Sequence, residues 1–220
     1  MLLIQSVLDT EDLSRVRDIL SGLPFRDGRL SAGATARQVK ANQQADADNP
    51  KTAALADFVR KKLMAQPLFA NYARPARWSK LLFSRYGAED AYGLHTDDAL
   101  MRDEDGDALR TDLSFTLFLA DPASYEGGAL SLEGPEGTRD IRLVAGDMVI
   151  YRTGLIHQVT PVTKGERLAC VGWVQSLIRR EDQREILFDL WQLQNAVPQG
   201  PARLTAQKSI GNLLRMWSET

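Results

Sequence analysis

The sequence is poor in the features that mark secreted, membrane-spanning or nucleic-acid-binding proteins. It has one cysteine, Cys170, so no internal disulfide can form. No apolar run approaches the ~20 residues needed to cross a bilayer, and the first residues lack the basic flank of a signal peptide. The net charge is −2 and no long basic stretch occurs, which argues against a nucleic-acid partner. We therefore expect a cytoplasmic protein without membrane or nucleic-acid contacts, in which Cys170 is an inert core thiol.

The first third of the chain has mainly helical patterning. With 220 residues and 44% apolar content the chain is long enough for a buried core. One helical pattern begins at Asp9 and ends at Gly22, and a second begins after Asn49-Pro50. Residues 31–49 between them are polar and weakly patterned. We therefore expect residues 1–76 to form a helical layer of the catalytic domain.

The middle of the chain has the patterning of a β-structure. Residues 78–86 are rich in aromatic side chains and predict a strand, and apolar residues alternate from Leu113 to Leu119 as in a half-buried strand. Short apolar segments continue to residue 174, separated by turn signals such as Gly127-Gly128, where we expect a tight turn or bulge. Helical stripes return after Gln175. The sequence thus predicts a mainly β fold with flanking helices (α+β), with a β core over residues 77–177 and a C-terminal helical extension over residues 178–220.

Only two histidines occur in the chain: His95 belongs to the triplet His95-Thr96-Asp97, and His157 opens the segment His157-Gln158-Val159-Thr160-Pro161. On an extended backbone residues i and i+2 project to the same side, so His95 and Asp97 can point at one ion. Two imidazoles and one carboxylate cover one face of an octahedral ion and leave three positions open, as non-haem Fe(II) oxygenases require. The same side chains also serve catalytic zinc. A zinc-dependent hydrolase and a non-catalytic, cupin-like metal-binding barrel are therefore the alternatives.

Arg167 follows His157 by ten residues, beyond a turn at residues 163–166. We expect a β-hairpin there to set the Arg167 strand beside the His157 strand. An arginine in that position could bind a carboxylate through two parallel hydrogen bonds. A surface ion pair is the alternative for a lone hairpin arginine, but the three candidate ligands nearby favour the carboxylate site.

Taken together, these residues resemble the Fe(II)/2-oxoglutarate oxygenases, which have the order His-X-Asp, about 60 residues, His, ten residues, Arg. The segment from Arg85-Tyr86-Gly87 to Tyr92-Gly93-Leu94-His95 resembles the strand before the first metal ligand in prolyl 4-hydroxylases. A tyrosine nine residues before that histidine contacts 2-oxoglutarate in the family, and Tyr86 holds this place. The branch that the chain resembles over nearly its whole length is the bacterial PKHD-type hydroxylases. Trp173 stands where the nucleic-acid-dealkylating branch has a second arginine.

The resemblance implies a fold, a reaction and a set of ligands. The fold would be a double-stranded β-helix (jelly-roll) core. His95, Asp97 and His157 would hold Fe(II), while Arg167 and Tyr86 would bind 2-oxoglutarate. Hydroxylation of a peptidyl or small-molecule substrate, in a context linked to iron uptake, would consume O₂ and release succinate and CO₂. Ascorbate is linked to the family as a reductant.

Two further segments carry expectations. The acidic residues 97–107 predict a solvated loop, with a lid that recognises a basic substrate as the second hypothesis. The C-terminal helices could form a surface for homo-oligomerisation. The orientations of Thr111, Ser114, Asn71 and Trp173 are left open by the sequence.

Overall fold

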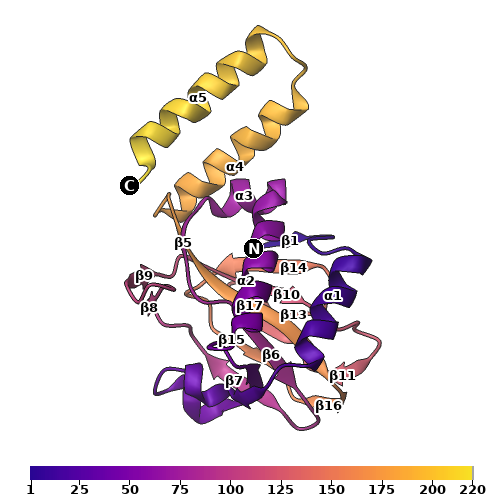
Figure 1. Cartoon of the computed structure of the whole chain (residues 1–220). Helices are drawn as coiled ribbons and strands as arrows, with labels where there is room; N and C mark the ends of the chain where they lie inside the picture. Colours follow the sequence, from indigo (N-terminus) through magenta and orange to yellow (C-terminus); the bar gives the residue numbers. More distant parts are fainter. Residues whose placement is uncertain (220) are drawn as a thin grey trace.

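Two antiparallel sheets face each other in the computed structural model, which describes residues 1–219 (Figure 1). The larger sheet has the spatial order β1 (Leu2–Ile4), β14 (Met148–Arg152), β10 (Leu113–Phe118), β17 (Arg167–Ser176), β6 (Leu82–Tyr86), β4 (Gln43–Ala45) and β2 (Phe25–Asp27), and β5 (Pro75–Trp78) also pairs with β17. The smaller sheet has the order β13 (Gly137–Ile141), β12 (Leu130–Gly134), β15 (His157–Val159), β7 (Ala91–His95) and β3 (Lys40–Ala41). This is a jelly-roll arrangement, and the predicted mainly β fold with flanking helices is confirmed.

The larger sheet is buried on both faces. Every residue of β10 is buried, whereas the alternation of apolar residues predicted a half-buried strand. Leu113, Phe115 and Leu117 pack into the main apolar core with the N-terminal helices, while Ser114 and Thr116 face the pocket between the sheets. The half-buried prediction was wrong because the second sheet covers the face with the polar side chains.

Helices α1 (Thr10–Ser21), α2 (Pro50–Ala65) and α3 (Pro67–Ala73) cover the outer face of the larger sheet. Asp9 forms a capping box with Asp12 at the start of α1, and Asn49 accepts the backbone N–H of Lys51 at the start of α2. Both predicted helix starts are confirmed. Cys170 is buried in the core beneath these helices, and its burial raises the pKa of the thiol, as expected for an inert residue.

The N-terminal third is more than a helical layer. Strands β1 to β4 all lie within it, and they extend both sheets: β1 pairs with β14, β4 pairs with β6, and β3 pairs with β7. The polar segment 31–49 therefore supplies strands to both walls of the pocket. Strands of two or three residues are too short to show an alternation of apolar and polar residues, so the sequence pattern did not predict these strands.

The stretch predicted as one strand over residues 78–86 is divided. Strand β5 ends at Trp78 and β6 begins at Leu82, and both pair with β17 at different places. Ser79 lies between them and accepts the backbone N–H of Trp173 with its hydroxyl. The break shifts the pairing, so the prediction of a single continuous strand was wrong.

The pairing of β11 (Tyr125–Gly127) with β16 (Val162–Gly165) has a bulge between Glu126 and Gly127, at the start of the Gly127-Gly128 pair where a tight turn or bulge was expected. The φ angles of the two glycines are +71° and +61°, a region that favours glycine. A Cβ on Gly127 would lie 2.0 Å from the carbonyl oxygen of Pro161, and one on Gly128 would lie 3.1 Å from Cδ of Arg167. The lack of side chains at these two glycines thus allows the backbone of Pro161 and the side chain of Arg167, the first residue of β17, to pack closely against them.

We expect Gly127→Ala to lower the free energy of unfolding by about 2 kcal/mol or more, because the left-handed backbone and the Pro161 contact both oppose a side chain. Gly154→Ala is the matched control, since that glycine has an ordinary φ and nothing within 4 Å of its missing Cβ. The control should change stability by no more than about 0.5 kcal/mol. Urea denaturation measures both variants, and equal midpoints would contradict the prediction.

Helices α4 (Glu181–Ala196) and α5 (Pro201–Trp217) form a hairpin that extends from the β body beside α3 (Figure 1). Ile178, Leu187 and Ile210 form a separate apolar cluster within it. The proposed boundaries of the helical layer, the β core and the extension stay predictions. Over residues 1–219, no helix is both long enough and apolar enough to span a bilayer.

Candidate active site

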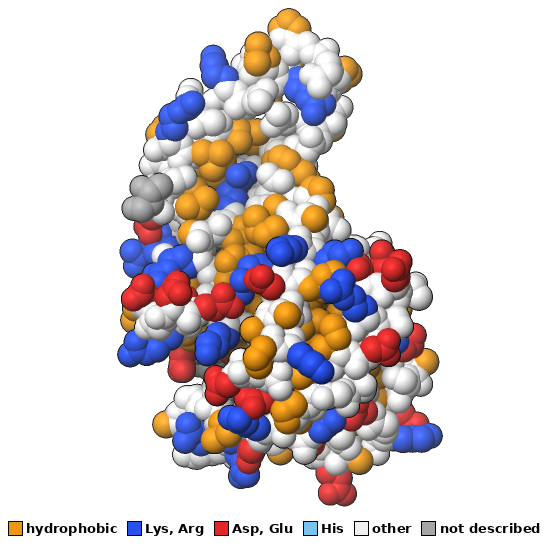
Figure 2. Space-filling view, viewed as in Figure 1, with side chains coloured by type: hydrophobic (Ala, Val, Ile, Leu, Met, Phe, Trp, Pro, Cys, Tyr) orange, Lys and Arg blue, Asp and Glu red, His pale blue; other side chains and the backbone are white. Residues whose placement is uncertain are grey.

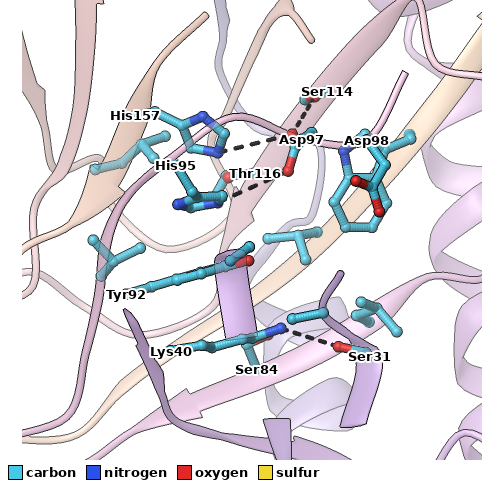
Figure 3. Close-up of a pocket in the computed structure, with 18 of the residues that line it drawn as sticks. Ser31, Lys40, Ser84, Tyr92, His95, Asp97, Asp98, Ser114, Thr116 and His157 are labelled. Carbon is cyan, nitrogen blue, oxygen red and sulfur yellow. Dashed lines mark hydrogen bonds and ion pairs between the residues drawn. The ribbon is translucent and has the colours of Figure 1, made fainter. Parts of the chain in front are cut away.

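A pocket lies between the two sheets. Strands β6, β10 and β17 supply one wall, and β7, β12 and β15 supply the other. Residues of the polar N-terminal segment, including Ser31, Lys40 and Gln44, close one side. The pocket therefore collects side chains from segments that are far apart in the sequence (Figure 3).

His95, Asp97 and His157 converge in this pocket. His157 and His95 are direct partners in the pairing of β15 with β7, and Asp97 follows two residues after β7 ends. Nε2 of His95 lies 3.9 Å from Oδ1 of Asp97, and Nε2 of His157 lies 3.8 Å from Oδ2 of the same carboxylate. All three side chains are buried, and their ligand atoms lie within 4.8 Å of one another. This spacing lets one ion contact all three.

The protonation of the two imidazoles suits metal binding. Nδ1–H of His95 donates to the carbonyl oxygen of Gly93 at 2.8 Å, and Nδ1–H of His157 donates to that of Leu155 at 3.0 Å. Each Nε2 therefore carries a lone pair directed at the Asp97 carboxylate (Figure 3). Burial lowers the pKa of His95 to about 4, and the nearby His157 adds to this effect. At neutral pH His95 is uncharged, as a metal ligand must be.

Ser114 orients the carboxylate of the group. This residue, on β10, donates its hydroxyl hydrogen to Oδ2 of Asp97 at 2.9 Å, and the Thr153 hydroxyl lies 3.0 Å from the serine oxygen. Ser114 belongs to the larger sheet, whereas both histidines belong to the smaller one. The hydrogen bond therefore fixes Asp97 from the opposite wall.

We expect Ser114→Ala to weaken Fe(II) binding by about 10- to 100-fold, the range seen when a partner that orients a ligand is lost. Anaerobic titration with Fe(II) measures the affinity. Ser124→Ala is the control, because that hydroxyl donates only to the carbonyl of Asp121 on the exposed surface. Wild-type affinity in Ser114→Ala would contradict the orienting role.

Arg167 is the first residue of β17 and is only 1% exposed. Its guanidinium carbon lies 5.2 Å from the ring centre of Tyr86 and 5.5 Å from that of Phe118. Among residues 1–219, its Nε and Nη1 groups have no hydrogen-bond partner. A buried guanidinium without a partner is strongly unfavourable. The pocket therefore suits an anion, and a carboxylate matches the planar fork of N–H donors that a guanidinium offers.

Tyr86 lies directly across from Arg167, because the two residues are partners in the pairing of β6 with β17. Burial raises the pKa of Tyr86 to about 12, so its hydroxyl stays protonated and can donate a hydrogen bond. The two residues that the family resemblance assigned to 2-oxoglutarate are thus neighbours in the same pocket.

The expected position of the Arg167 strand was wrong. The strand with His157, β15, pairs with β12 and β7, whereas β17 pairs with β10, β6 and β5. Residues 160–166 cross from one sheet to the other, and β16 within them pairs with β11 instead. Arg167 consequently faces the three candidate ligands from the opposite wall, which leaves room for a molecule between them.

Sequence reasoning missed several residues of the pocket. The ring of Tyr92 stacks on His95, with 3.6 Å between ring centres. Lys40 is buried, and its Nζ donates to the hydroxyl of Ser31 at 3.0 Å. Trp173 lines the pocket with a buried indole N–H that has no partner among residues 1–219. Lys40 and Ser31 lie in the weakly patterned segment, where no motif marked them.

The remaining open residues have simple roles. The hydroxyl of Thr111 donates to the carbonyl oxygen of Asp98 at 2.6 Å, next to the site. The side-chain amide of Asn71 donates to the carbonyl oxygen of Pro67 within α3, outside the pocket. Thr111 therefore supports the loop after β7, and Asn71 stabilises its own helix.

The acidic segment 97–107 is more ordered than a solvated loop. It contains β8 (Leu100–Arg102), which pairs with β9 (Ala108–Arg110). Asp103 forms an ion pair with Arg77, and Glu104 forms one with Arg60. Asp98, Glu104, Asp105 and Asp107 are exposed to solvent as expected, but the segment is part of a hairpin that these ion pairs fix to the body rather than a loop. The lid stays a hypothesis.

Comparison with known proteins identifies the family. A family model described as the 2OG-Fe(II) oxygenase superfamily matches residues 81–175. A PKHD-type hydroxylase from Maricaulis maris (strain MCS10) is 49% identical over 220 residues, which cover 98% of each chain.

Two solved structures share the fold. HygX from Streptomyces hygroscopicus, with nickel, 2-oxoglutarate and hygromycin B bound, has a TM-score of 0.55 at 18% identity, covering 80% of this chain and 83% of HygX. A prolyl hydroxylase from Trichoplax adhaerens, in complex with a hypoxia-inducible-factor peptide fragment, has a TM-score of 0.54 at 15% identity, covering 84% and 86%. On the evidence of its full-length relative, the chain belongs to the PKHD-type hydroxylases of the 2OG-Fe(II) oxygenase superfamily and is a 2-oxoglutarate-dependent non-haem iron dioxygenase.

Proposed function

We propose that His95, Asp97 and His157 hold the Fe(II) of this dioxygenase and that Arg167 and Tyr86 bind the far carboxylate of 2-oxoglutarate. The observation that carries the proposal is the buried Arg167, whose Nε and Nη1 groups face a pocket without a protein partner. A bare metal-binding barrel has no use for such a cation, and the sequence has no recognisable zinc-protease motif that would place the general base of a zinc hydrolase.

The chain's residues prepare the site in two ways. His95 and His157 present their Nε2 atoms and Asp97 a carboxylate, all from one side, so the other positions of an octahedral ion stay accessible. Arg167 offers parallel N–H donors for a carboxylate, and the protonated Tyr86 hydroxyl offers one more. When bound, Fe(II) and 2-oxoglutarate supply the activation of O₂, with release of succinate and CO₂ and hydroxylation of substrate.

The test is an anaerobic titration of metal-free protein with Fe(II) and 2-oxoglutarate. A visible charge-transfer band that needs both additions would support the proposal. Succinate in place of 2-oxoglutarate is the control, because it lacks the keto group needed for chelation and should give no band. Absence of a band together with tight Zn²⁺ binding would contradict it.

The substrate belongs to a small-molecule or peptidyl class. Related folds accept both kinds, since HygX holds hygromycin B and the prolyl hydroxylase holds a peptide. Fold similarity transfers chemistry better than substrate choice. A siderophore-like molecule linked to iron uptake is the candidate that follows from the PKHD-type branch. Screening such compounds for succinate release tests it, and release that no such compound stimulates would speak against it.

The chain also self-associates, we propose, through the α4–α5 hairpin. Leu193, Leu204 and Met216 are 60%, 66% and 72% exposed there, and Figure 2 shows apolar side chains along this part of the surface. Sedimentation velocity should show a dimer or larger species that Leu204→Asp disrupts; a monomer at all concentrations would contradict it. Cytoplasmic location and the use of ascorbate stay predictions.

A further inference from the structure

Lys40 is a cation inside the pocket to which no role has been given. It lies on β3 as the partner of Tyr92 on β7, and it is only 7% exposed. Its Nζ lies 4.9 Å from the ring centre of Tyr92. Figure 3 shows the Tyr92 ring between Lys40 and His95, so one aromatic ring separates the ammonium from the candidate metal site.

A network of polar side chains holds the ammonium in place. The Ser31 hydroxyl accepts from Nζ and lies 2.6 Å from Oε1 of Gln44, and Nε2 of Gln44 donates to the Ser84 hydroxyl at 3.3 Å. These side chains come from the N-terminal segment and from β6, and all of them line the pocket. The Lys40 ammonium is therefore held by Ser31, which is itself held by Gln44 and, through Gln44, by Ser84 on β6.

The charge of Lys40 has no protein counter-ion. In the described part of the chain, no carboxylate lies within ion-pair distance of Nζ, and its one hydrogen-bond acceptor is the Ser31 hydroxyl, although an ammonium has three donors. Burial lowers the pKa of Lys40 to about 8, so the side chain is still mainly protonated at neutral pH. The carboxylates of Asp97 and Asp27 favour the charged form from beyond ion-pair distance, but a buried ammonium whose contacts are all neutral is unfavourable unless an anion joins it.

The expected ligands of the pocket do not supply that anion. Fe(II) and Arg167 together carry three positive charges. Asp97 and the two carboxylates of 2-oxoglutarate carry three negative charges. With the proposed metal and cosubstrate bound, these groups balance one another and leave no net negative charge to compensate Lys40.

We propose that Lys40 is a specificity-determining residue that binds a carboxylate or similar anionic group of the substrate. This inference rests on the proposed function and gives it a substrate class. An anion at Lys40 would place the rest of the substrate along Tyr92, towards the metal. The aromatic ring and the nearby indole of Trp173 favour a flat or apolar body next to the anionic group.

The experiment uses the anaerobic protein with Fe(II) and 2-oxoglutarate bound, titrated by calorimetry with two matched pairs of probes. Benzoate and benzamide form the first pair. An acetylated dipeptide with a free C-terminus and its C-terminal amide form the second, which distinguishes a peptide carboxylate from a free acid. We expect the anionic member of at least one pair to bind ten-fold or more tightly than its neutral counterpart.

Lys40→Met should reduce this preference to two-fold or less, while Lys40→Arg should keep most of it. Lys164→Met is the control for charge, because that lysine is exposed and pairs with Glu126 outside the pocket. Each variant is also titrated with 2-oxoglutarate, using the charge-transfer band as a readout of the intact site. Lys40→Arg keeps the question decidable if Lys40→Met does not fold, since a preference lost with the charge retained would contradict charge recognition.

Three results would overturn the inference. The first is equal binding of both members in both pairs by the wild-type protein, and the second is an unchanged preference in Lys40→Met. The third is a ten-fold loss of 2-oxoglutarate affinity in Lys40→Met without a change in preference, which would assign Lys40 to the cosubstrate. A missing charge-transfer band in the wild-type protein would instead refute the proposed metal and cosubstrate site, so the two failures are distinguishable.

Discussion

His95→Ala protein is expected to show no charge-transfer band with Fe(II) and 2-oxoglutarate, and no succinate release. Removal of His95 leaves one imidazole and one carboxylate, which cannot hold the ion on one face. Loss of an orienting partner alone weakens metal binding by about 10- to 100-fold, so loss of a ligand should weaken it by about 100-fold at least. Asp97→Ala should behave in the same way.

Asp98→Ala is the matched control for the carboxylate. Asp98 is the next residue in the chain and also lines the pocket, but its side chain is exposed near Gly33 rather than among the histidines. This variant should retain the band. A wild-type band in His95→Ala, or a loss of the band in Asp98→Ala equal to that in Asp97→Ala, would contradict the ligand assignment.

Arg167→Met should weaken 2-oxoglutarate binding while Fe(II) binding is retained. Loss of one partner of a buried, hydrogen-bonded charge pair costs about 2–5 kcal/mol, which corresponds to a dissociation constant about 30- to 4,000-fold higher. Titration of the chelate band with 2-oxoglutarate measures the change. Arg139→Met is the control, because that arginine lies on the exposed strand β13. Unchanged affinity in Arg167→Met would remove Arg167 from the cosubstrate site.

The same variant separates binding from folding. Without cosubstrate, Arg167→Met should be at least as stable as the wild type, because the change removes a buried charge that lacks a partner. With cosubstrate at 100 times its dissociation constant, the wild type should gain about 2.7 kcal/mol. The variant should gain no more than about 0.9 kcal/mol at that concentration. Thermal unfolding with and without 2-oxoglutarate shows both effects.

The chemical core of the site was accessible from the sequence because its residues are few and distinctive. With only two histidines available, His95 and His157 had to be considered together, and the structure places them directly across from each other in adjacent strands. The case of Arg167 was different. Arg167 was expected in the pocket, but on a strand that forms a hairpin with the His157 strand. That hairpin does not form, because the connecting segment crosses from one sheet to the other.

The rest of the pocket could not be read from local patterns. Strands β2, β3 and β4 are two or three residues long, and they form because longer strands offer them free edges. Lys40 and Gln44 are buried by that pairing, although lysine and glutamine are usually exposed. Which polar residues enter a pocket is thus decided by tertiary contacts between distant segments, and these have no periodic signal.

The absence of a side chain at Gly128 has a consequence for which oxo acid the pocket binds. A Cβ on this residue would lie 3.1 Å from Cδ of Arg167, so the glycine makes room for the arginine stem, while Tyr86 and Phe118 flank its guanidinium. The positive group is thereby held at a set depth below the three candidate ligands. We propose that this position selects the length of the diacid: oxaloacetate, one methylene shorter than 2-oxoglutarate, and 2-oxoadipate, one methylene longer, should both bind more weakly than 2-oxoglutarate.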